Sequence, residues 1–335
     1  MQTSLLRRNI KASKWMEQIR AMPGFGPTFG ATPLNRIKIP GTHDSGTYEM
    51  DGHNWYQTQD FSITEQLKLG VRYFDLRCME SDGVPMIHHG KGVLAVIGNS
   101  LETDLDMIRL FVDGHPGEIV MVKIKCEKEL ISSVCFMARQ MLGSRIFDQD
   151  PKNPIQISTL TYDHLINPND IDLSHPVIIF IDVPKADSKI NSRISNNKFF
   201  PFREYCSGNY SNSDNPQKIL ANFRDARIIS KQKGKDALKP NTFNLHYFTA
   251  TGQYLKATDK GHSVQRLTYQ LDQCIHSDQF GMFNFEIPRS LGYICEDKPG
   301  ELSPINIVLF DFVTSHKAQR IWALNLPKPP EQPQK

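Results

Sequence analysis

The stretch "IKIPGTHDSGTYEM" at residues 37–50 joins an apolar run to a cluster of polar side chains. The run stops at Pro40-Gly41, and His43 and Asp44 follow at once, just where a strand would end. Two interpretations of such a pair are open. It is either an ordinary turn that contains a histidine, or a titratable pair held at the mouth of a barrel. The rest of the sequence has to separate the two.

The length and charge of the chain narrow its class. At 335 residues it is long for one ordinary domain but normal for a single α/β barrel. Its 39 basic and 36 acidic residues give a formal net charge of +3. That charge is too weak to argue for nucleic acid as a partner, and it is compatible with a mild attraction to anionic membrane surfaces.

The cysteines and the apolar runs exclude other classes. None of the six cysteines forms a C-x-x-C pair, so a zinc site of the usual spacing is not expected, and we predict reduced thiols. No run approaches the ~20 apolar residues of a membrane-spanning helix, so we predict no transmembrane segment.

Short apolar runs alternate with stretches of helical periodicity along the chain. This alternation predicts a mainly parallel sheet, and seven or eight such units predict an α/β fold, a distorted (β/α)8 TIM-like barrel in a single domain. The predicted helices are residues 62–70 and 100–118. The predicted strands are residues 35–39, 71–77, 84–89, 118–124, 176–182, 242–249 and 305–313.

Composition divides the chain into three parts. Residues 1–34 are predicted to be a lead-in with one short helix, 35–325 the barrel, and 326–335 a disordered Pro-rich tail. Residues 185–241 are rich in polar side chains and are predicted to form long loops. Their apolar outcrop "NNKFFPF" (196–202) has two interpretations: core packing under a loop, which we favour, or exposed aromatics that reach lipid.

Ionisable side chains recur at the carboxyl ends of the predicted strands. Barrel enzymes carry their catalytic groups at that end. Five such coincidences in one chain favour a catalytic site over five unrelated turns. The residues are His43 and Asp44, Asp75 and Arg77, His88 and His89, Asp182, and Asp311.

The types of these residues suggest phosphoryl chemistry. Of two histidines, one takes a proton from an attacking hydroxyl and the other gives a proton to the leaving oxygen, while the planar fork of an arginine suits phosphate oxygens. Because side chains alternate along a strand, Asp75 and Arg77 share a face, but only one of His88 and His89 points into the mouth. Spacing alone does not choose between them.

The motifs resemble those of a known family. "SKWMEQI", "IPGTHDSGTY", "GVRYFDLR", "MIHHG", "HPGEIVMVKIK" and "NLHYFTATG" closely resemble the bacterial phosphatidylinositol-specific phospholipase C (PI-PLC) family, over roughly residues 13–315. The resemblance implies a distorted (β/α) barrel. It also implies cleavage of membrane phosphatidylinositol to diacylglycerol and inositol 1,2-cyclic phosphate.

The resemblance also implies a role for each residue of the two histidine centres. His43 matches the general base that deprotonates the inositol 2-hydroxyl, and Asp311 the carboxylate that orients this base. His89, and not its neighbour, matches the general acid that protonates the diacylglycerol oxygen. Asp44 matches the carboxylate that supports the acid.

Arg77 matches the arginine that clamps the phosphate, and Asp75 another carboxylate of the active site. Animal relatives use calcium, bound by an Asn after the first histidine and by acidic residues on the next strand. Here Asp44 stands in place of the Asn and Arg77 in place of one acid. We therefore predict metal-independent chemistry with no cofactor, in which the guanidinium supplies the positive charge.

The residues expected to bind the head group depart from the family pattern. Asp182 stands where relatives have an Arg, and "SGNY" keeps Tyr210 but has Gly208 in place of an Asp. Lys123 and Lys125 share a strand face, so either can contact the ring or a phosphate, or both are ordinary barrel-end lysines. We expect Asp182, Tyr210 and the two lysines on the substrate-binding side.

The resemblance finally implies a monomer that acts at membrane surfaces and is secreted or translocated by a route not visible in this chain. Two other functions are open. One is a metal-dependent phosphodiesterase of the same architecture, glycerophosphodiesterase-like or sphingomyelinase D-like, although "FDLR" lacks the second acid that such enzymes need. The other is a non-catalytic inositide-binding module, although all the expected catalytic residues are present.

Overall fold

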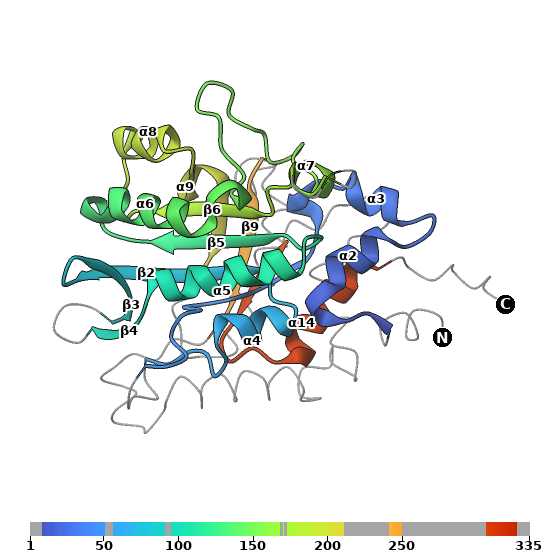
Figure 1. Cartoon of the computed structure of the whole chain (residues 1–335), viewed down its shortest axis with the longest axis horizontal. Helices are drawn as coiled ribbons and strands as arrows, with labels where there is room; N and C mark the ends of the chain where they lie inside the picture. The colour runs from blue at the N-terminus through green and yellow to red at the C-terminus, as the bar shows by residue number, and fades with distance from the viewer. Residues whose placement is uncertain are drawn as a thin grey trace.

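The computed structural model describes residues 9–50, 56–90, 95–167, 170, 173–210, 241–249 and 306–326 (Figure 1). Eight parallel strands form one curved sheet in the order β7-β6-β5-β2-β1-β10-β9-β8. These strands are β1 (Ile39–Thr42), β2 (Tyr73–Ser81), β5 (Val120–Lys125), β6 (Val177–Asp182), β7 (Phe200–Pro201), β8 (Cys206–Asn209), β9 (Phe243–Phe248) and β10 (Ile307–Phe310).

The sheet curls into an incomplete barrel. β1 pairs with both β2 and β10, so the last described strand lies beside the first. Within the described ranges no pairing joins β7 to β8, so the barrel is open at that seam. This confirms the predicted distorted (β/α) barrel and gives one cause of its distortion.

Helices cover the outside of the sheet, and α5 and α6 pack against each other beside β2, β5 and β6 (Figure 1). The α-helices are α2 (Trp15–Arg20), α3 (Gly26–Gly30), α4 (Ile63–Lys68), α5 (Leu101–Gly114), α6 (Ile131–Leu142), α7 (Tyr162–Leu165), α8 (Ser188–Asn196), α9 (Phe202–Tyr205) and α14 (Ser315–Trp322). The two helices predicted at 62–70 and 100–118 are confirmed as α4 and α5. The 3-10 helices are Ala12–Lys14, Leu34–Arg36, Lys128–Leu130, Gly143–Arg145 and Ala323–Asn325.

Two apolar cores lie on the two faces of the sheet. Along β5 the side chains alternate, so Met121 belongs to the core inside the barrel and Val122 to the core under the helices. Tyr73 and Leu309 join the inner core, and Ile108 of α5 joins the outer one. Burial on both faces explains why these strands read as continuous apolar runs.

The predicted strand at 84–89 has the right bounds but a different place. β3 (Val84–His89) pairs antiparallel with β2 and with β4 (Val96–Ser100), off the barrel. Strand β2 is long enough to extend beyond its parallel neighbours, and the chain turns back on it at Asp82-Gly83. Cys78 therefore lies opposite Ile87, and the hairpin carries its last residues back toward the barrel mouth.

Part of the region predicted as long loops is regular. Residues 185–210 contain α8, β7, α9 and β8, and residues 211–240 lie outside the described part. Helix α8 has few apolar residues, so its sequence resembles a loop, but the Asp187 side chain caps it by accepting from the Ile190 N–H. In "NNKFFPF", Phe199 and Phe200 are buried, as the core-packing interpretation predicts.

The lead-in contains two α-helices, α2 and α3, where one was predicted. Pro27 lies in the first turn of α3, where proline is compatible with a helix. The Trp15 ring is buried and stacks on Trp322 of α14 with centroids 6.3 Å apart. The predicted tail beyond Leu326 lies outside the described residues, and the predicted domain boundaries stay predictions.

The described cysteines, Cys78, Cys126, Cys135 and Cys206, are buried free thiols, as predicted; Cys274 and Cys295 lie outside the described residues. Among the described helices, none has both the length and the apolar character needed to cross a bilayer.

Candidate active site

The turn after β1 buries the His-Asp pair. His43 is 4% exposed and Asp44 is 1% exposed. At Gly41 an added Cβ would lie 3.1 Å from Cβ of Tyr73, so only glycine lets β1 and β2 approach this closely. Asp44 has φ 44°, a left-handed conformation that aspartate tolerates better than most residues. The chain turns sharply here, directly above the barrel.

Asp311 follows β10 and lies against His43. Its Oδ1 is 3.0 Å from Nδ1 of His43. A carboxylate only accepts, so Nδ1 carries the proton in this bond. Arg77 Nη2 lies 3.1 Å from Nε2 of the same ring, and a guanidinium only donates, so Nε2 is the acceptor. With Nδ1 donating to Asp311 and Nε2 accepting from Arg77, the lone pair of the ring is on Nε2.

Burial and charge oppose each other at this pair. Burial lowers the pKa of His43, but the nearby negative charges of Asp44 and Asp311 outweigh it, and the pKa is raised. Burial raises the pKa of Asp311, and His43 offsets only part of that rise.

Asp44 lies between the two histidines. Its Oδ2 is 3.3 Å from Nε2 of His43 and 3.5 Å from Nε2 of His89, and its Oδ1 is 2.5 Å from Nε of Arg77. Burial alone would raise the pKa of Asp44. The charge of Arg77 and of the histidines outweighs burial and holds this pKa well below its usual range. Asp44 is therefore an anion at the centre of the cluster.

Of the two adjacent histidines, His89 is the one that lies beside Asp44. His89 reaches Asp44, and its Nδ1 lies 2.5 Å from the Tyr56 carbonyl oxygen, which accepts the Nδ1 proton. Nε2 is thereby left facing the Asp44 carboxylate. His88 lies on the other face of β3, and burial followed by Arg77 lowers its pKa. The hairpin, and not a barrel strand, delivers His89 to the site.

Three residues of this cluster have atoms placed as metal ligands would be. Donor atoms of His43, Asp44 and Asp75 lie within 4.8 Å of one another. However, Asp44 is already paired with Arg77, and Asp75 Oδ1 lies 3.1 Å from Nζ of Lys123. Calcium takes six to eight oxygen ligands. Two carboxylates that already hold cations and one imidazole do not fit that demand.

The expected head-group residues Lys123 and Asp182 contact each other. Lys123 Nζ lies 3.6 Å from Asp182 Oδ2 as well as 3.1 Å from Asp75, and the Phe202 ring covers it at 4.7 Å. Burial lowers the pKa of Lys123, but Asp75 leads the attractions that raise it overall. Asp182 also accepts from Arg203 Nε at 3.3 Å. Both groups are thus held within a buried ion cluster.

Lys125 and Tyr210 are more open. Lys125 lies across the strands from Arg77 and from Asp182, and burial, then the charge of Arg77, lowers its pKa. Tyr210 is 39% exposed, and its ring centroid lies 5.5 Å from that of His43. The predicted roles of Lys125 and Tyr210 as substrate-binding residues stay predictions.

Sequence reasoning missed several groups at the site. The Tyr56 carbonyl contacts His89, and a main-chain acceptor leaves no sequence signal. The side chains of Thr58 and Gln59 donate to the His43 carbonyl. Tyr247 packs its ring edge-on to His43 at 5.9 Å. Its place on the inward face of the predicted strand 242–249 was a usable signal. Arg203 lies in the region taken for a loop.

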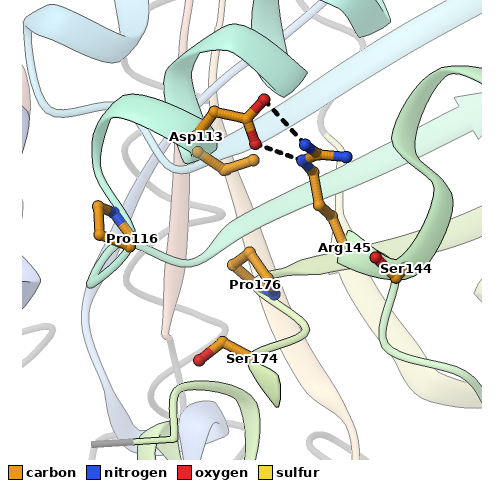
Figure 2. A pocket seen from close by; sticks show the side chains of 7 residues that line it. Asp113, Pro116, Ser144, Arg145, Ser174 and Pro176 are labelled. Atoms are coloured by element: carbon orange, nitrogen blue, oxygen red, sulfur yellow. Dashed lines mark hydrogen bonds and ion pairs between the residues drawn. The ribbon is translucent and has the colours of Figure 1, made fainter. Parts of the chain in front are cut away.

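A cavity of about 220 Å³ lies elsewhere in the molecule (Figure 2). Asp113, Pro116, Arg145 and Pro176 help to line it, and Figure 2 shows the paired Asp113 and Arg145 side chains. These residues precede β5 and β6 in the chain. The cavity is therefore at the amino ends of the strands, away from the histidines.

Residues 32–180 match the family model described as "Phosphatidylinositol-specific phospholipase C, X domain". This part of the chain is a PI-PLC X domain. The X domain contains five of the six predicted catalytic residues, and the sixth, Asp311, comes from β10 beyond it. The five are His43, Asp44, Asp75, Arg77 and His89.

Curated relatives match mainly around this X domain. A 1-phosphatidylinositol phosphodiesterase of Staphylococcus aureus (strain Newman) is 32% identical over 105 residues, which are 30% of this chain and 33% of that relative. A 1-phosphatidylinositol phosphodiesterase of Listeria monocytogenes is 30% identical over 144 residues, 41% of this chain and 40% of the relative. The chain thus aligns with about a third to two fifths of these relatives' length.

The whole fold also has solved counterparts. The phosphatidylinositol-specific phospholipase C of Listeria monocytogenes superposes with a TM-score of 0.62 at 16% identity, covering 95% of this chain and 100% of that one. At this identity the likeness concerns the fold, and it supports the predicted distorted barrel from the X domain through β10.

Proposed function

We propose that this protein is a phosphatidylinositol-specific phospholipase C, a phosphoric diester hydrolase of the lyase type, which needs no metal ion. One observation carries the proposal. Nε2 of His43 and Nε2 of His89 both lie within 3.5 Å of the same Asp44 oxygen, beside the Arg77 guanidinium. Acid–base cleavage of a phosphodiester needs such a pair of proton carriers around one cation.

In the first half of the step, Nε2 of His43 takes the proton of the inositol 2-hydroxyl. The hydroxyl oxygen forms a bond to phosphorus. Asp311 holds the ring in the required tautomer and stabilises the imidazolium that results, as its 3.0 Å contact with Nδ1 supports.

In the second half, the bond between phosphorus and the diacylglycerol oxygen breaks. His89 in its imidazolium form gives the Nε2 proton to that oxygen, since Nδ1 is committed to the Tyr56 carbonyl. The products are diacylglycerol and inositol 1,2-cyclic phosphate, and no water is consumed. Slow hydrolysis of the cyclic product follows with the two histidine roles reversed.

Arg77 supplies the positive charge for the phosphate. Its Nη2 donates to the Nε2 atom of His43 from 3.1 Å, which is where the attacking hydroxyl and a phosphate oxygen would arrive. A planar guanidinium can then turn its donors to the phosphate oxygens. Its pairing with Asp44 also supports chemistry without calcium.

The substrate is a membrane lipid, so we propose that the protein acts at membrane surfaces. The related phosphodiesterases are named for the same lipid head group. Export and a monomeric state remain predictions from the sequence.

The test uses phosphatidylinositol vesicles in excess EDTA, with water-soluble phosphorus followed by 31P NMR. Wild type is expected to release the cyclic phosphate, and His43→Ala and His89→Ala are expected to lose at least 1,000-fold in rate. Arg145→Lys, at the other end of the barrel, is the control. Activity that appears only after calcium or magnesium is added would instead favour a metal-dependent phosphodiesterase. Vesicle binding without turnover would favour a binding module.

A further inference from the structure

Residues 56–59, here called the bridging segment, run between the turn after β1 and the turn after β10. Thr58 is 1% exposed and Gln59 is completely buried, although both are polar. Burying a polar side chain costs free energy unless its donors and acceptors find partners. The partners of these two side chains lie in the two turns that carry the proposed base and its carboxylate.

Gln59 uses its whole amide group to join the turns. Its Nε2 donates to the carbonyl of His43 at 3.0 Å and to the carbonyl of Phe310 at 2.9 Å. Its Oε1 accepts from the N–H of Val313 at 3.2 Å. The two N–H donors of one amide therefore hold the main chain of the proposed base, His43, and of the residue before Asp311.

Thr58 joins the same turns through its hydroxyl and its main chain. The hydroxyl lies 3.0 Å from the His43 carbonyl and 3.1 Å from the Asp44 carbonyl. The Thr58 carbonyl accepts from the Phe312 N–H at 2.7 Å. Phe312 has φ 46°, so this bond holds a left-handed turn directly after Asp311.

The bridging segment reaches the second histidine as well. The Tyr56 carbonyl accepts from Nδ1 of His89, and the Tyr56 ring packs edge-on to the imidazole with centroids 5.7 Å apart. The β3–β4 hairpin that carries His89 lies off the barrel. Residues 56–59 thus contact the turn of the base, the turn of its carboxylate and the acid.

Building on the catalytic roles proposed above, we propose that the bridging segment is the positioning element of the site. Gln59 and Thr58 set the separation of His43 from Asp311. Tyr56 sets the direction in which His89 presents its proton. Gln59 and Thr58 donate to main-chain carbonyls of the turns, and the Tyr56 carbonyl accepts from Nδ1 of His89, so the segment acts through the histidines.

Gln59→Glu is the sharpest single change. It preserves shape but replaces two N–H donors by oxygen, so an acceptor then faces two carbonyl oxygens in a buried place. We expect the turns to move apart and kcat to fall roughly 10- to 100-fold with KM changed less than about threefold, because small misplacements of catalytic groups are costly. Gln149→Glu is the matched control, since Gln149 is also buried and its amide donates to Tyr205, outside the histidine cluster.

A readout that needs no turnover is the proton NMR signal of His43 Nδ1–H, which the Asp311 carboxylate shifts far downfield. We expect Gln59→Glu to shift or broaden this signal and the control to leave it in place. Thr58→Val should act in the same direction more weakly, and Thr58→Ser, which restores the hydroxyl, should recover both the signal and kcat.

The outcomes separate this inference from the proposed function. If wild type shows no lipase activity but the signal responds as described, the positioning role stands and the reaction is wrong. If a folded Gln59→Glu variant keeps the wild-type signal, pH profile and kcat, the positioning role is wrong. If Gln59→Glu does not fold, the Thr58→Val and Thr58→Ser pair decides by the same three readouts.

Discussion

Nη2 of Arg77 donates a hydrogen bond to Nε2 of His43 across 3.1 Å. In this contact Nε2 is the acceptor, and the charge of Arg77 opposes part of the rise that Asp44 and Asp311 cause in the pKa of His43. The contact also places a permanent positive charge beside the base, where a phosphate would be bound. Arg77 thus joins His43 and Asp44 in one charged cluster, which is the arrangement that the proposed reaction uses.

Replacing Arg77 tests whether its fork or only its charge is needed. We expect Arg77→Lys to lower kcat/KM roughly 100-fold or more, because an ammonium cannot contact Asp44, His43 and two phosphate oxygens with one rigid plane. Vesicle assays in EDTA measure this. A Lys variant with wild-type rates would show that charge alone suffices.

Removing the Asp311 charge is expected to change the pH profile. Asp44 and Asp311 raise the pKa of His43 against the opposing effect of burial. In Asp311→Asn that pKa should fall, so the acidic limb of kcat/KM, which reports His43 becoming neutral, should move to lower pH while the maximal rate drops. A limb that stays in place would assign it to another group.

Asp104 gives a pH dependence of stability unrelated to the histidines. Burial raises its pKa from 3.8 to about 7, against the hydrogen bond that Tyr48 donates at 2.9 Å. Since the folded state keeps the proton and the unfolded state loses it, the free energy of unfolding should fall by up to about 1.4 kcal/mol per pH unit between about pH 4 and pH 7 and then level off.

Asp104→Asn removes this titration. The difference in unfolding free energy between the variant and wild type should therefore become more favourable to the variant from pH 5 to pH 8, measured by urea denaturation. A difference that is constant over this range would mean that the Asp104 carboxyl is already ionised in the folded protein.

Lys123 is expected to matter for stability. Lys123→Met leaves Asp75 without its cation and Asp182 with Arg203 alone, and breaking a buried ion cluster in this way typically costs about 3–5 kcal/mol. Adding Asp75→Asn should recover part of the loss, because a neutral amide tolerates burial better. Urea unfolding of both variants checks this, and additive losses would contradict the pairing.

The sequence predicted most strands that are buried on both faces, because continuous apolar runs such as that of β5 have no other simple explanation. The first strand was placed wrongly at 35–39: Leu34–Arg36 form a 3-10 helix, and β1 is Ile39–Thr42, which continues through Pro40-Gly41. It did not predict β7 or β8. β7 has two residues, and "CSGN" of β8 shows no apolar alternation. These strands are fixed by neighbours such as β6 and β9, which local sequence does not contain.

For the site, residue types and order predicted that His43, Asp44, Arg77, His89 and Asp311 would come together. They did not reveal how His89 arrives, since β3 resembles any other strand until its pairing with β2 is known. Gln59 was also beyond reach, because its partner Val313 is 254 positions away in the chain.

The unpaired seam between the described strands β7 and β8 lies far from the strands that position the histidine cluster. The proton carriers and the arginine depend on β1, β2 and β10, in the middle of the eight-strand order, whereas the seam lies at its two ends. A barrel whose described strands are unpaired only between β7 and β8 can change its width there without moving β1, β2 and β10 on the opposite side. The open edge and the histidine cluster thus lie in different halves of the described barrel.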